Sequence, residues 1–396
     1  MSVQALPRPA KVKVVFYNDP KIRSLFFQLI LLAVVLSVLW FAYDNTVYNL
    51  KKRNIAQGFA FWNVEAGFDI SQTLIPYSAA SSYGQAFWVG LLNTLLVSSL
   101  SIFFATVIGI FIGVLRLSKN WIVSRLAAFY IELFRNVPLL LVLYFWYGAV
   151  LGSLPEPRDS ISIPGDIWLN ARGLLIPRPV FLAEFWIVAV GFLVAVLGAF
   201  FAVRYARQKQ AATGVRPPGG LIATLLIIGL PLIVYFLAGQ PLGLDMPAKG
   251  RFNITGGLNL APELVAMVVG LSTYTAAFIA ESVRAGVVAV SKGQSEAAHS
   301  LGLTDNQTLR LVVMPQALRV IVPPLNSEFL SLTKNSSLGV SIGYPDLVNV
   351  FTGTVLNQTG QAIEMVSITM LVYLTFSLLT SAFMNWFNKR VALVER

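Results

Sequence analysis

Eight long apolar segments constrain the fold of this chain more than any other feature of its sequence. A bilayer core of about 30 Å requires about 20 mostly apolar residues in one helix, because unpaired backbone groups are not tolerated in hydrocarbon. We therefore predict an all-α polytopic membrane protein with about eight transmembrane helices. The predicted spans are residues 25–43, 86–115, 127–151, 184–203, 221–240, 263–288, 323–343 and 363–386.

The composition agrees with a membrane protein and excludes several other classes. Of the 396 residues, 56% are hydrophobic and 12% are charged, whereas a soluble domain carries about 25% charged residues. With no Cys and a single His, the chain cannot form a disulfide-stapled secreted module, a cysteine-ligated zinc site or a histidine-rich metal site. Segment 25–43 is too long for the core of a signal peptide, so we interpret it as a retained anchor.

The net charge of +11 is interpreted as topology, because Lys and Arg are retained on the cytoplasmic side. With the N-terminus inside, inside segments hold 19 of the 29 Lys and Arg residues and outside segments hold 8. An N-in, C-in topology requires an even number of spans, which eight satisfies. We predict that the outside segments 44–85, 152–183 and 241–262 are ordered extracytoplasmic loops rather than domains.

Residues 291–322 form a cytoplasmic segment that is too structured for a simple linker. The spacing S/T-x-x-Q of a capping box occurs twice, at Ser291–Gln294 and at Thr304–Gln307. Gly302 stands where a helix ends in a left-handed residue, and we expect Pro315 to stop the second helix. The segment therefore predicts two short helices around a glycine turn. Because such helices are marginal alone in water, they lie against the membrane core or a partner.

Two other interpretations of this segment compete. A helix–turn–helix with a glycine turn also begins many DNA-binding modules. The flanking spans leave no room to reach a duplex groove, and the second helix carries only Arg310 as a strong cation. An ordinary structured loop is the other alternative.

The residue pattern of this segment resembles the "EAA" motif of membrane-spanning subunits of binding-protein-dependent ABC importers. Val312 and Met314 are mild departures from the isoleucine and leucine of that motif. In that family the first short helix is a coupling helix that docks in a cleft of the ATPase subunit. The resemblance therefore implies ATPase coupling by Glu296, Ala297, Ala298, Gly302 and Pro315.

Four further segments resemble the polar amino-acid importer branch of the same family. They are residues 90–116, 132–147, 274–287 and 332–338. The resemblance implies a five-helix permease core, which maps to the second, third, sixth, seventh and eighth spans. The layout is most similar to the larger permease subunit of general L-amino-acid importers. Since the third span ends outside and the sixth begins outside, an insertion between them must hold an even number of helices, and it holds two.

This mapping divides the chain into a core and three additional helices. The predicted parts are a cytoplasmic N-terminus (1–24), an extra transmembrane anchor (25–43), an extracytoplasmic loop (44–85), the first part of the permease core (86–151), an insertion with two extra transmembrane helices (152–262), the second part of the core (263–386) with the coupling loop (291–322), and a cytoplasmic tail (387–396).

Polar and ionisable side chains inside the predicted spans are the candidates for a substrate pathway. A charge there costs about 2.5–3.5 kcal/mol on insertion scales, so it usually faces a bundle interior. An amino acid requires an acceptor for its ammonium group and a donor for its carboxylate. The pathway candidates are Thr273, Tyr274, Glu281, Glu328, Lys334, Asn335, Ser336 and Ser337.

Three more residues have either a structural or a pathway role. Arg284 lies one helical turn from Glu281, so an internal ion pair competes with substrate contact. Pro138 favours a structural kink, and Asn136 or Arg135 can satisfy a backbone carbonyl that the proline frees. Whether Lys334 contacts a substrate carboxylate or neutralises another side chain is open at this stage.

The sequence offers no catalytic chemistry. It contains no GxxxxGK[ST] motif, so no phosphate-cradling loop is available for ATP, and His299 stands alone. We predict no enzyme activity, no catalytic residue, no metal site and no cofactor in this chain. ATP and Mg²⁺ are expected on a partner ATPase.

The resemblance implies a multi-pass permease subunit of an ATP-driven L-amino-acid importer in a bacterial inner membrane. Its expected partners are ATPase subunits, a second permease in a heteromeric pair, an extracytoplasmic amino-acid-binding protein, the amino acid and the lipid bilayer, without nucleic acid. One alternative is an ion-coupled secondary transporter, which requires inverted repeats with broken helices that we do not find. The other is a non-transporting membrane scaffold.

Overall fold

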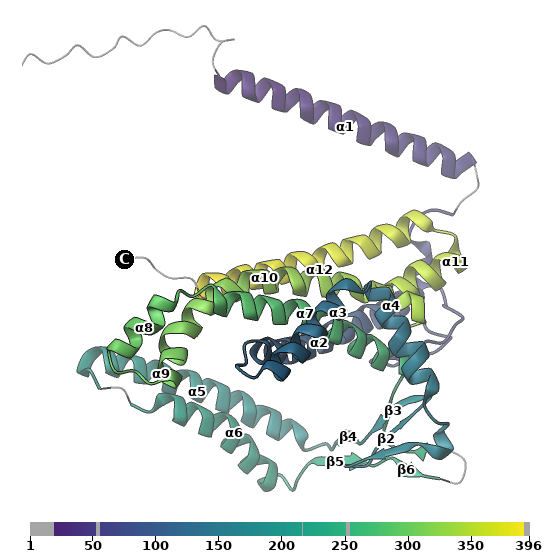
Figure 1. Cartoon of the computed structure of the whole chain (residues 1–396). Coiled ribbons are helices and arrows are strands. Elements are labelled where there is room, and N and C mark those ends of the chain that lie inside the picture. The colour runs from purple at the N-terminus through teal and green to yellow at the C-terminus, as the bar shows by residue number, and fades with distance from the viewer. Residues whose placement is uncertain (1–19, 53–55, 216, 251–253, 392–396) are drawn as a thin grey trace, which may run out of the picture.

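The computed structural model of the chain describes residues 20–52, 56–215, 217–250 and 254–391. The predicted cytoplasmic N-terminus and tail therefore lie partly outside the described residues. Helices dominate the described chain, and short strands gather at one end of it (Figure 1).

Long apolar helices carry the architecture. Seven helices of the described residues are long and apolar enough to cross a membrane, and one sharply bent pair adds an eighth candidate. The long helices are α1 (Pro20–Lys52), α2 (Tyr83–Arg116), α5 (Phe185–Thr213), α6 (Gly219–Leu237), α7 (Pro262–Val288), α10 (Met314–Asn335) and α12 (Ala362–Val391). The predicted all-α class and number of spans are confirmed, and the N-in, C-in orientation stays a prediction.

The third predicted span is bent rather than straight. Its parts are α3 (Trp121–Asn136), α4 (Leu139–Tyr144), the π-helical turn η3 (Phe145–Val150) and the 3-10 turn η4 (Leu151–Ser153). The two halves meet at 109°. A residue before proline avoids the helical region, and Val137, which precedes Pro138, adopts φ −97° and ψ 131°. The kink predicted at Pro138 is therefore confirmed, and the span predicted over 127–151 is divided at this proline.

The seventh predicted span begins earlier than the sequence suggested. It consists of α9 (Asp305–Thr308), the π-helical η6 (Leu309–Val313), α10 and the 3-10 helix η7 (Ser336–Ile342). Pro315 lies in the first turn of α10, directly after the π-helical η6, and the chain stays helical through this proline. Pro323 and Pro324 lie inside α10. The predicted helix stop at Pro315 and the span start at residue 323 are both wrong.

α7 is the central helix of the core bundle. It packs against α2, α10, α3 and α4. Of the residues in its most apolar stretch, 61% are buried, which is the largest share among the candidate spans of the described chain. Glycines allow the close approach of α2. A Cβ added at Gly109 would lie 2.6 Å from the Cβ of Ile279, and one at Gly113 would lie 2.8 Å from the Cβ of Val283. Small residues thus bring two membrane helices into backbone contact.

Short strands form a cap at the end of the molecule where α5 begins and α6 ends (Figure 1). One antiparallel sheet has the order β1–β2–β3–β8, while β4 pairs with β5 and β6 with β7. The strands are β1 (Ile161–Ile163), β2 (Ile167–Asn170), β3 (Gly173–Ile176), β4 (Arg178–Phe181), β5 (Leu242–Asp245), β6 (Ala248–Lys249), β7 (Ile254–Thr255) and β8 (Leu258–Leu260). The β3–β8 ladder joins segments 152–183 and 241–262, and the sequence analysis predicted no such strand pairing.

The two helices of the predicted insertion form a hairpin beside the core (Figure 1). α5 and α6 pack along each other through small residues. The buried residues of this contact are Gly191, Ala195, Ala199 and Ala206 on α5, and Gly219 and Ala223 on α6. The strand pair β4–β5 connects the hairpin to the cap.

Candidate translocation site

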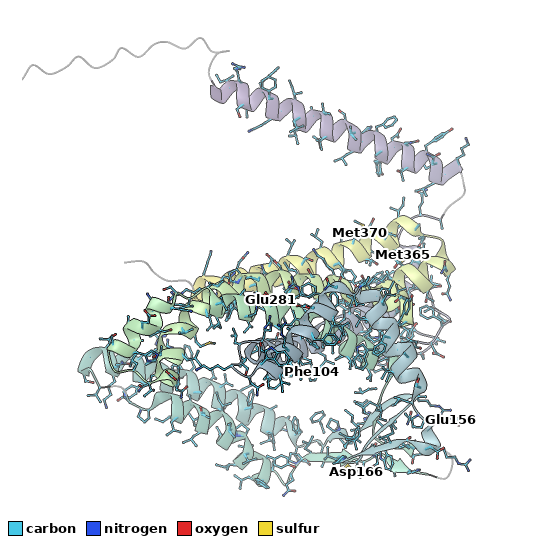
Figure 2. The ribbon with its side chains drawn as sticks, viewed as in Figure 1. Phe104, Glu156, Asp166, Glu281, Met365 and Met370 are labelled. Carbon is cyan, nitrogen blue, oxygen red and sulfur yellow. The ribbon has the colours of Figure 1, made fainter. Side chains whose placement is uncertain are left out.

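Glu281 and Arg284 form an ion pair on α7. Arg284 Nη2 donates to Glu281 Oε1 at 2.6 Å, and Nε donates to Oε2 at 2.9 Å. The two side chains remain 29% and 34% exposed, respectively, so the pair lies at an open side of the core. Figure 2 shows Glu281 among the core helices, far from Glu156 and Asp166 at the strand cap. The ion pair predicted from the spacing is present.

Arg135 brings a second cation to this pair from α3. Its guanidinium carbon lies 5.6 Å from the ring centroid of Phe278, which precedes Glu281 by one turn on α7. Arg135 is also close enough to interact electrostatically with both Glu281 and Glu328. Since Glu328 lies on α10, three core helices contribute charge to one region. Opposite charges held together in this way lower the cost of placing each of them in a membrane.

Aromatic side chains border this charge cluster. The rings of Tyr274 and Phe278 lie 5.1 Å apart at 49°, and Tyr274 interacts electrostatically with Glu328. The hydroxyl of Tyr130 on α3 donates to the backbone carbonyl of Thr273 at 2.6 Å. The hydroxyl of Thr273 itself donates to a carbonyl of its own helix, one turn earlier, at 2.7 Å. Phe278 and Tyr130 were missed in the sequence, although Phe278 stands one helical turn from Tyr274.

The break in the third span sets the position of Arg135. α3 ends one residue after Arg135, and Pro138 directs the chain into α4 with φ −59° and ψ 135°. Asn136 Nδ2 donates to the carbonyl of Glu132 at 2.7 Å, so the asparagine caps the last turn. The Arg135 guanidinium is thereby available to the charge cluster rather than to the backbone.

Lys334 belongs to a second polar group, between α10 and α12. It lines a groove of about 440 Å³ together with Ser337, Thr369 and Tyr373. Ion pairs within the described residues involve neither Lys334 nor Glu328, so Lys334 does not neutralise that carboxylate in this structure. The structure therefore separates the predicted pathway residues into two groups.

The remaining candidates of this second group serve mainly the local backbone. Ser336 is buried and donates to the carbonyl of Thr333 at 2.8 Å, while Ser337 donates to the carbonyl of Lys334 at 2.7 Å. Asn335 ends α10 and is partly exposed. Their hydroxyl hydrogen bonds support the change from α10 to the tighter helix η7.

Asn93 was not singled out from the sequence, yet it links α2 to two loops at the cap end. Its buried Nδ2 donates to the carbonyls of Gln72 and Pro345, each at 2.9 Å. The hydroxyl of Tyr344 in turn donates to the carbonyl of Asn93 at 2.9 Å. This amide therefore fixes the segment that follows η7 against the core.

Asp346 continues this buried network and was also missed. It is fully buried, and its Oδ1 accepts from the backbone N–H of Asn349 at 2.8 Å. The hydroxyl of Tyr373 on α12 donates to Oδ2 at 3.2 Å. Burial raises the pKa of Asp346 to about 7, against the opposing hydrogen bonds from Asn349 and Tyr373. Asp346 thus starts the π-helical η8 (Val348–Val355) and holds it to α12.

The EAA-like segment forms an exposed loop at the end opposite the strand cap (Figure 1). α8 (Lys292–Ser300) exposes Glu296 and Ala297, whereas Ala298 is buried. Gly302 has φ +80°, the left-handed conformation predicted for it. Leu301 is 83% exposed. The loop therefore presents an acidic side chain and a bare leucine beside a sharp turn.

One of the two predicted capping boxes forms. Thr304 Oγ1 accepts from the N–H of Gln307 at 3.4 Å, and Gln307 Oε1 accepts from the N–H of Thr304 at 2.9 Å. Ser291 is the N-cap of α8, but its side chain makes no capping hydrogen bond. Gln294 instead accepts a hydrogen bond from Gln316 of α10 at 3.1 Å. The prediction of a box at Ser291 is wrong because Gln294 has a tertiary partner.

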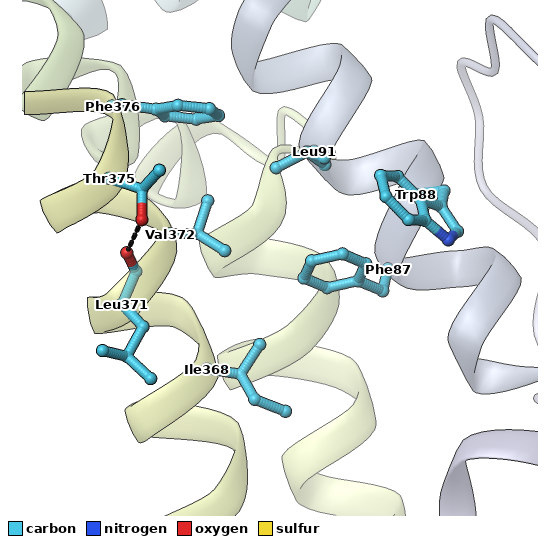
Figure 3. Close-up of a pocket in the computed structure, with 8 residues that line it drawn as sticks. All are labelled: Phe87, Trp88, Leu91, Ile368, Leu371, Val372, Thr375 and Phe376. Carbon is cyan, nitrogen blue, oxygen red and sulfur yellow. Dashed lines mark hydrogen bonds between the residues drawn. The ribbon is translucent and has the colours of Figure 1, made fainter. Parts of the chain in front are cut away.

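An apolar groove between α2 and α12 is distinct from both polar groups (Figure 3). Its volume is about 340 Å³, and no charged residue lines it. The hydroxyl of Thr375 on its wall donates to the carbonyl of Leu371 at 2.7 Å, so it is not available to a ligand. A lipid tail or an apolar helix suits this groove, and an amino acid does not.

The sequence matches the family described as "binding-protein-dependent transport system inner membrane component" over residues 219–393. It is 50% identical over 378 residues to the general L-amino acid transport system permease protein AapQ of Rhizobium johnstonii, covering 96% of this chain and 94% of that protein. It is 50% identical over 380 residues to the putative amino-acid ABC transporter permease protein YhdX of Escherichia coli, covering 96% and 97%.

A third relative extends the comparison. The glutamate/glutamine/aspartate/asparagine transport system permease protein BztB of Rhodobacter capsulatus is 40% identical over 409 residues, with 96% of each chain covered. The likeness thus spans the additional helices as well as the core. The chain belongs to the family of binding-protein-dependent transport system inner membrane components, and it is a multi-pass permease of the inner membrane rather than an enzyme.

Proposed function

We propose that this chain forms the membrane pathway of an ATP-driven importer of L-amino acids. The observation that carries the proposal is 50% identity across 94% of a general L-amino acid permease. The polar cluster of α3, α7 and α10 supports it, because it offers both signs of charge inside a bundle of membrane helices. A zwitterion requires both signs.

In this proposal the amino acid binds at the charge cluster, and the separate Lys334 group lines a further part of the pathway. Glu281 and Glu328 accept hydrogen bonds from the ammonium group, and Arg135 of the same cluster meets the carboxylate. Tyr274 borders the cluster, and Thr273 lies beside it on α7. Asn335, Ser336 and Ser337 shape the backbone around Lys334. Arg284 donates two hydrogen bonds to the Glu281 carboxylate, and Pro138 sets the bend that brings Arg135 inward.

The exposed loop around α8 is the proposed contact with an ATPase subunit, which binds ATP and Mg²⁺. Leu301 is 83% exposed beside the glycine turn, and docking of the ATPase subunit on α8 would cover it. Glu296, Ala297 and Gly302 lie on the exposed side, while the buried Ala298 and the hydrogen bond between Gln294 and Gln316 fix the loop to the core. A movement of α8 is therefore transmitted to α10, whose first turn contains Pro315.

We further propose a heteromeric pair with a distinct second permease, and delivery of substrate by an extracytoplasmic binding protein. Three helices beyond the five-helix core enlarge this chain, with α1 on one side of the core and the α5–α6 hairpin on the other (Figure 1). Such an enlargement is easier to accommodate once in a pair than twice. The apolar groove of α2 and α12 offers a surface for a neighbouring helix or lipid.

Reconstitution of the full chain in proteoliposomes with its ATPase, a second permease and a binding protein tests the proposal. We expect uptake of a radiolabelled amino acid that depends on ATP and stops when the ATPase is omitted. Uptake driven by a sodium or proton gradient without ATPase would identify a secondary transporter. An assembled complex without uptake under either condition would identify a scaffold.

A further inference from the structure

The end of α5 that points away from the strand cap (Figure 1) carries a cationic stripe. Five residues at helical spacing share this face and line a groove of about 470 Å³. They are Phe200, Val203, Arg204, Arg207 and Gln208. The stripe thus changes from apolar to cationic to neutral polar along the helix axis.

Most of the face that carries the stripe does not pack against α6. α5 buries a row of small residues in the hairpin, and Val203 is the stripe residue at its border, since a Cβ added at Gly219 of α6 would lie 3.6 Å from the Cα of Val203. Arg204 and Arg207 are exposed, and neither forms an ion pair within the described residues. The two guanidinium groups are therefore open to a ligand.

The hairpin sequence supplies no acidic partner for these cations. Between Glu184 and Asp245 the sequence contains no acidic residue. The cations of this stretch are Arg204, Arg207, Lys209 and Arg216. Lys209 lies 5.9 Å from the ring centroid of Tyr205. Because the hairpin sequence has no acidic residue, the arginine stripe has no neighbour of opposite charge on its own helix.

We propose that this stripe binds the phosphate group of an anionic phospholipid. Arg204 and Arg207 hold the phosphate, since guanidinium groups form paired hydrogen bonds with its oxygens. Phe200 and Val203 lie deeper along α5, where an acyl chain follows the headgroup, and Gln208 meets the outer headgroup atoms. The order of side chains along the helix matches the order of groups along a lipid.

The surroundings favour a lipid over other anions. α5 is a candidate membrane span, with a mean hydropathy of 2.6 over its most apolar part. Its cationic end therefore lies at the level of phospholipid headgroups. Basic pockets at the cytoplasmic ends of membrane helices are a recognised type of anionic-lipid site. A soluble phosphate compound would leave the apolar part of the stripe unused.

The enrichment of Lys and Arg in cytoplasmic segments would also place cations here. An experiment can distinguish this explanation from lipid binding. Topology requires only positive charge, which lysine supplies as well as arginine does. Paired hydrogen bonding to phosphate requires the guanidinium group. The Arg204→Lys/Arg207→Lys variant therefore keeps the topology while weakening the proposed site.

The test is native mass spectrometry of the full-length chain, released from detergent after equilibration with phosphatidylglycerol or phosphatidylcholine. We expect the wild type to retain phosphatidylglycerol preferentially. The Arg204→Gln/Arg207→Gln variant should lose about tenfold in apparent affinity for this lipid, and the double lysine variant should lie between the two. The matched control, Lys119→Gln/Lys389→Gln, removes two exposed charges at the ends of other helices and should behave as the wild type. The thermal midpoint in phosphatidylcholine nanodiscs establishes that each variant is folded.

Three outcomes would overturn the proposal. Equal retention by the wild type and the double glutamine variant would place the lipid elsewhere. Equal loss in the control pair would reduce the effect to net charge. Displacement of the lipid by millimolar inorganic phosphate would identify a site for a free anion rather than for a phospholipid.

Discussion

The guanidinium of Arg284 holds both carboxylate oxygens of Glu281, three residues earlier on α7, at 2.6 and 2.9 Å. The pair is about one-third exposed, and Arg135 from α3 interacts with the same carboxylate. Glu281 therefore still has a cation in its surroundings when Arg284 is removed or recruited. This redundancy lets a substrate ammonium group compete for the carboxylate without leaving Glu281 isolated.

Replacing Glu281 with Gln should lower ATP-dependent uptake at low substrate concentration about tenfold, because a charge-assisted hydrogen bond contributes about 1.5–3 kcal/mol. Initial rates in proteoliposomes measure this effect. Arg284→Gln should lower uptake less, since Arg135 still faces the carboxylate. Full recovery of uptake in the Glu281→Gln/Arg284→Gln double variant would show that the pair is only structural.

Replacing Gly302 with Val should weaken both ATPase association and ATP-dependent uptake. The residue has φ +80°, which costs a residue with a Cβ about 1–2 kcal/mol and a β-branched residue more. The matched control is Gly302→Asn, because asparagine tolerates the left-handed region. Co-purification of the ATPase with each variant measures the association. If the valine variant retains ATPase as the asparagine variant does, this turn is not part of the docking surface.

Much of the helical fold could be predicted because long apolar runs require membrane helices. The places where the chain bends or pairs with a distant segment were harder to predict. Pro138 predicted a kink, but hydropathy continues across Val137 and Pro138, so the sequence gave no sign that the bend reaches 109°. The pairing of β3 with β8 was also hidden, because two membrane helices separate these strands in the sequence.

The candidate site shows a similar division between local and tertiary information. The pairing of Glu281 with Arg284 follows from helical spacing alone. The approach of Arg135 and Glu328 requires the packing of three helices, which no local pattern contains. Asn93 lies in an apolar helix, and its partners at Gln72 and Pro345 are loop carbonyls that any sequence could supply.

Replacing Gly109 with Ala should destabilise the chain by about 1–3 kcal/mol, as overpacking does in other cores. The added methyl group would lie 2.6 Å from the Cβ of Ile279, so α2 and α7 must move apart. Gly229→Ala on α6 is the control, because nothing lies within 4 Å of its added Cβ. Thermal unfolding in detergent compares the two. Equal thermal unfolding midpoints for the two variants would mean that α2 and α7 are not closely packed at Gly109.

Replacing Thr304 with Ala should loosen the start of α9, since loss of an N-cap costs about 1 kcal/mol. Ser291→Ala should have little effect, because the Ser291 side chain makes no capping hydrogen bond. Hydrogen exchange of the amides around Asp305–Thr308 measures the difference. Faster exchange in both variants by the same factor would contradict the distinction between the two caps.

The stability of the chain should depend on the ionisation of Asp346. Burial raises its pKa from 3.8 to about 7, so the folded state binds this proton more tightly than the unfolded state. The resulting contribution to stability is fully present below the ordinary pKa and is lost as the pH rises through about 7. The thermal midpoint should therefore fall as the pH rises from about 4 to about 7 and stay level above that range.

Asp346→Asn removes the titrating group but keeps an oxygen that can accept from the N–H of Asn349. The midpoint of this variant should change less with pH than that of the wild type. Asp166→Asn is the control, because Asp166 is exposed at φ +56°, where asparagine is also tolerated, and it should follow the wild type. Parallel pH profiles for wild type and Asp346→Asn would show that the buried carboxyl group titrates no differently in the folded chain than in the unfolded one.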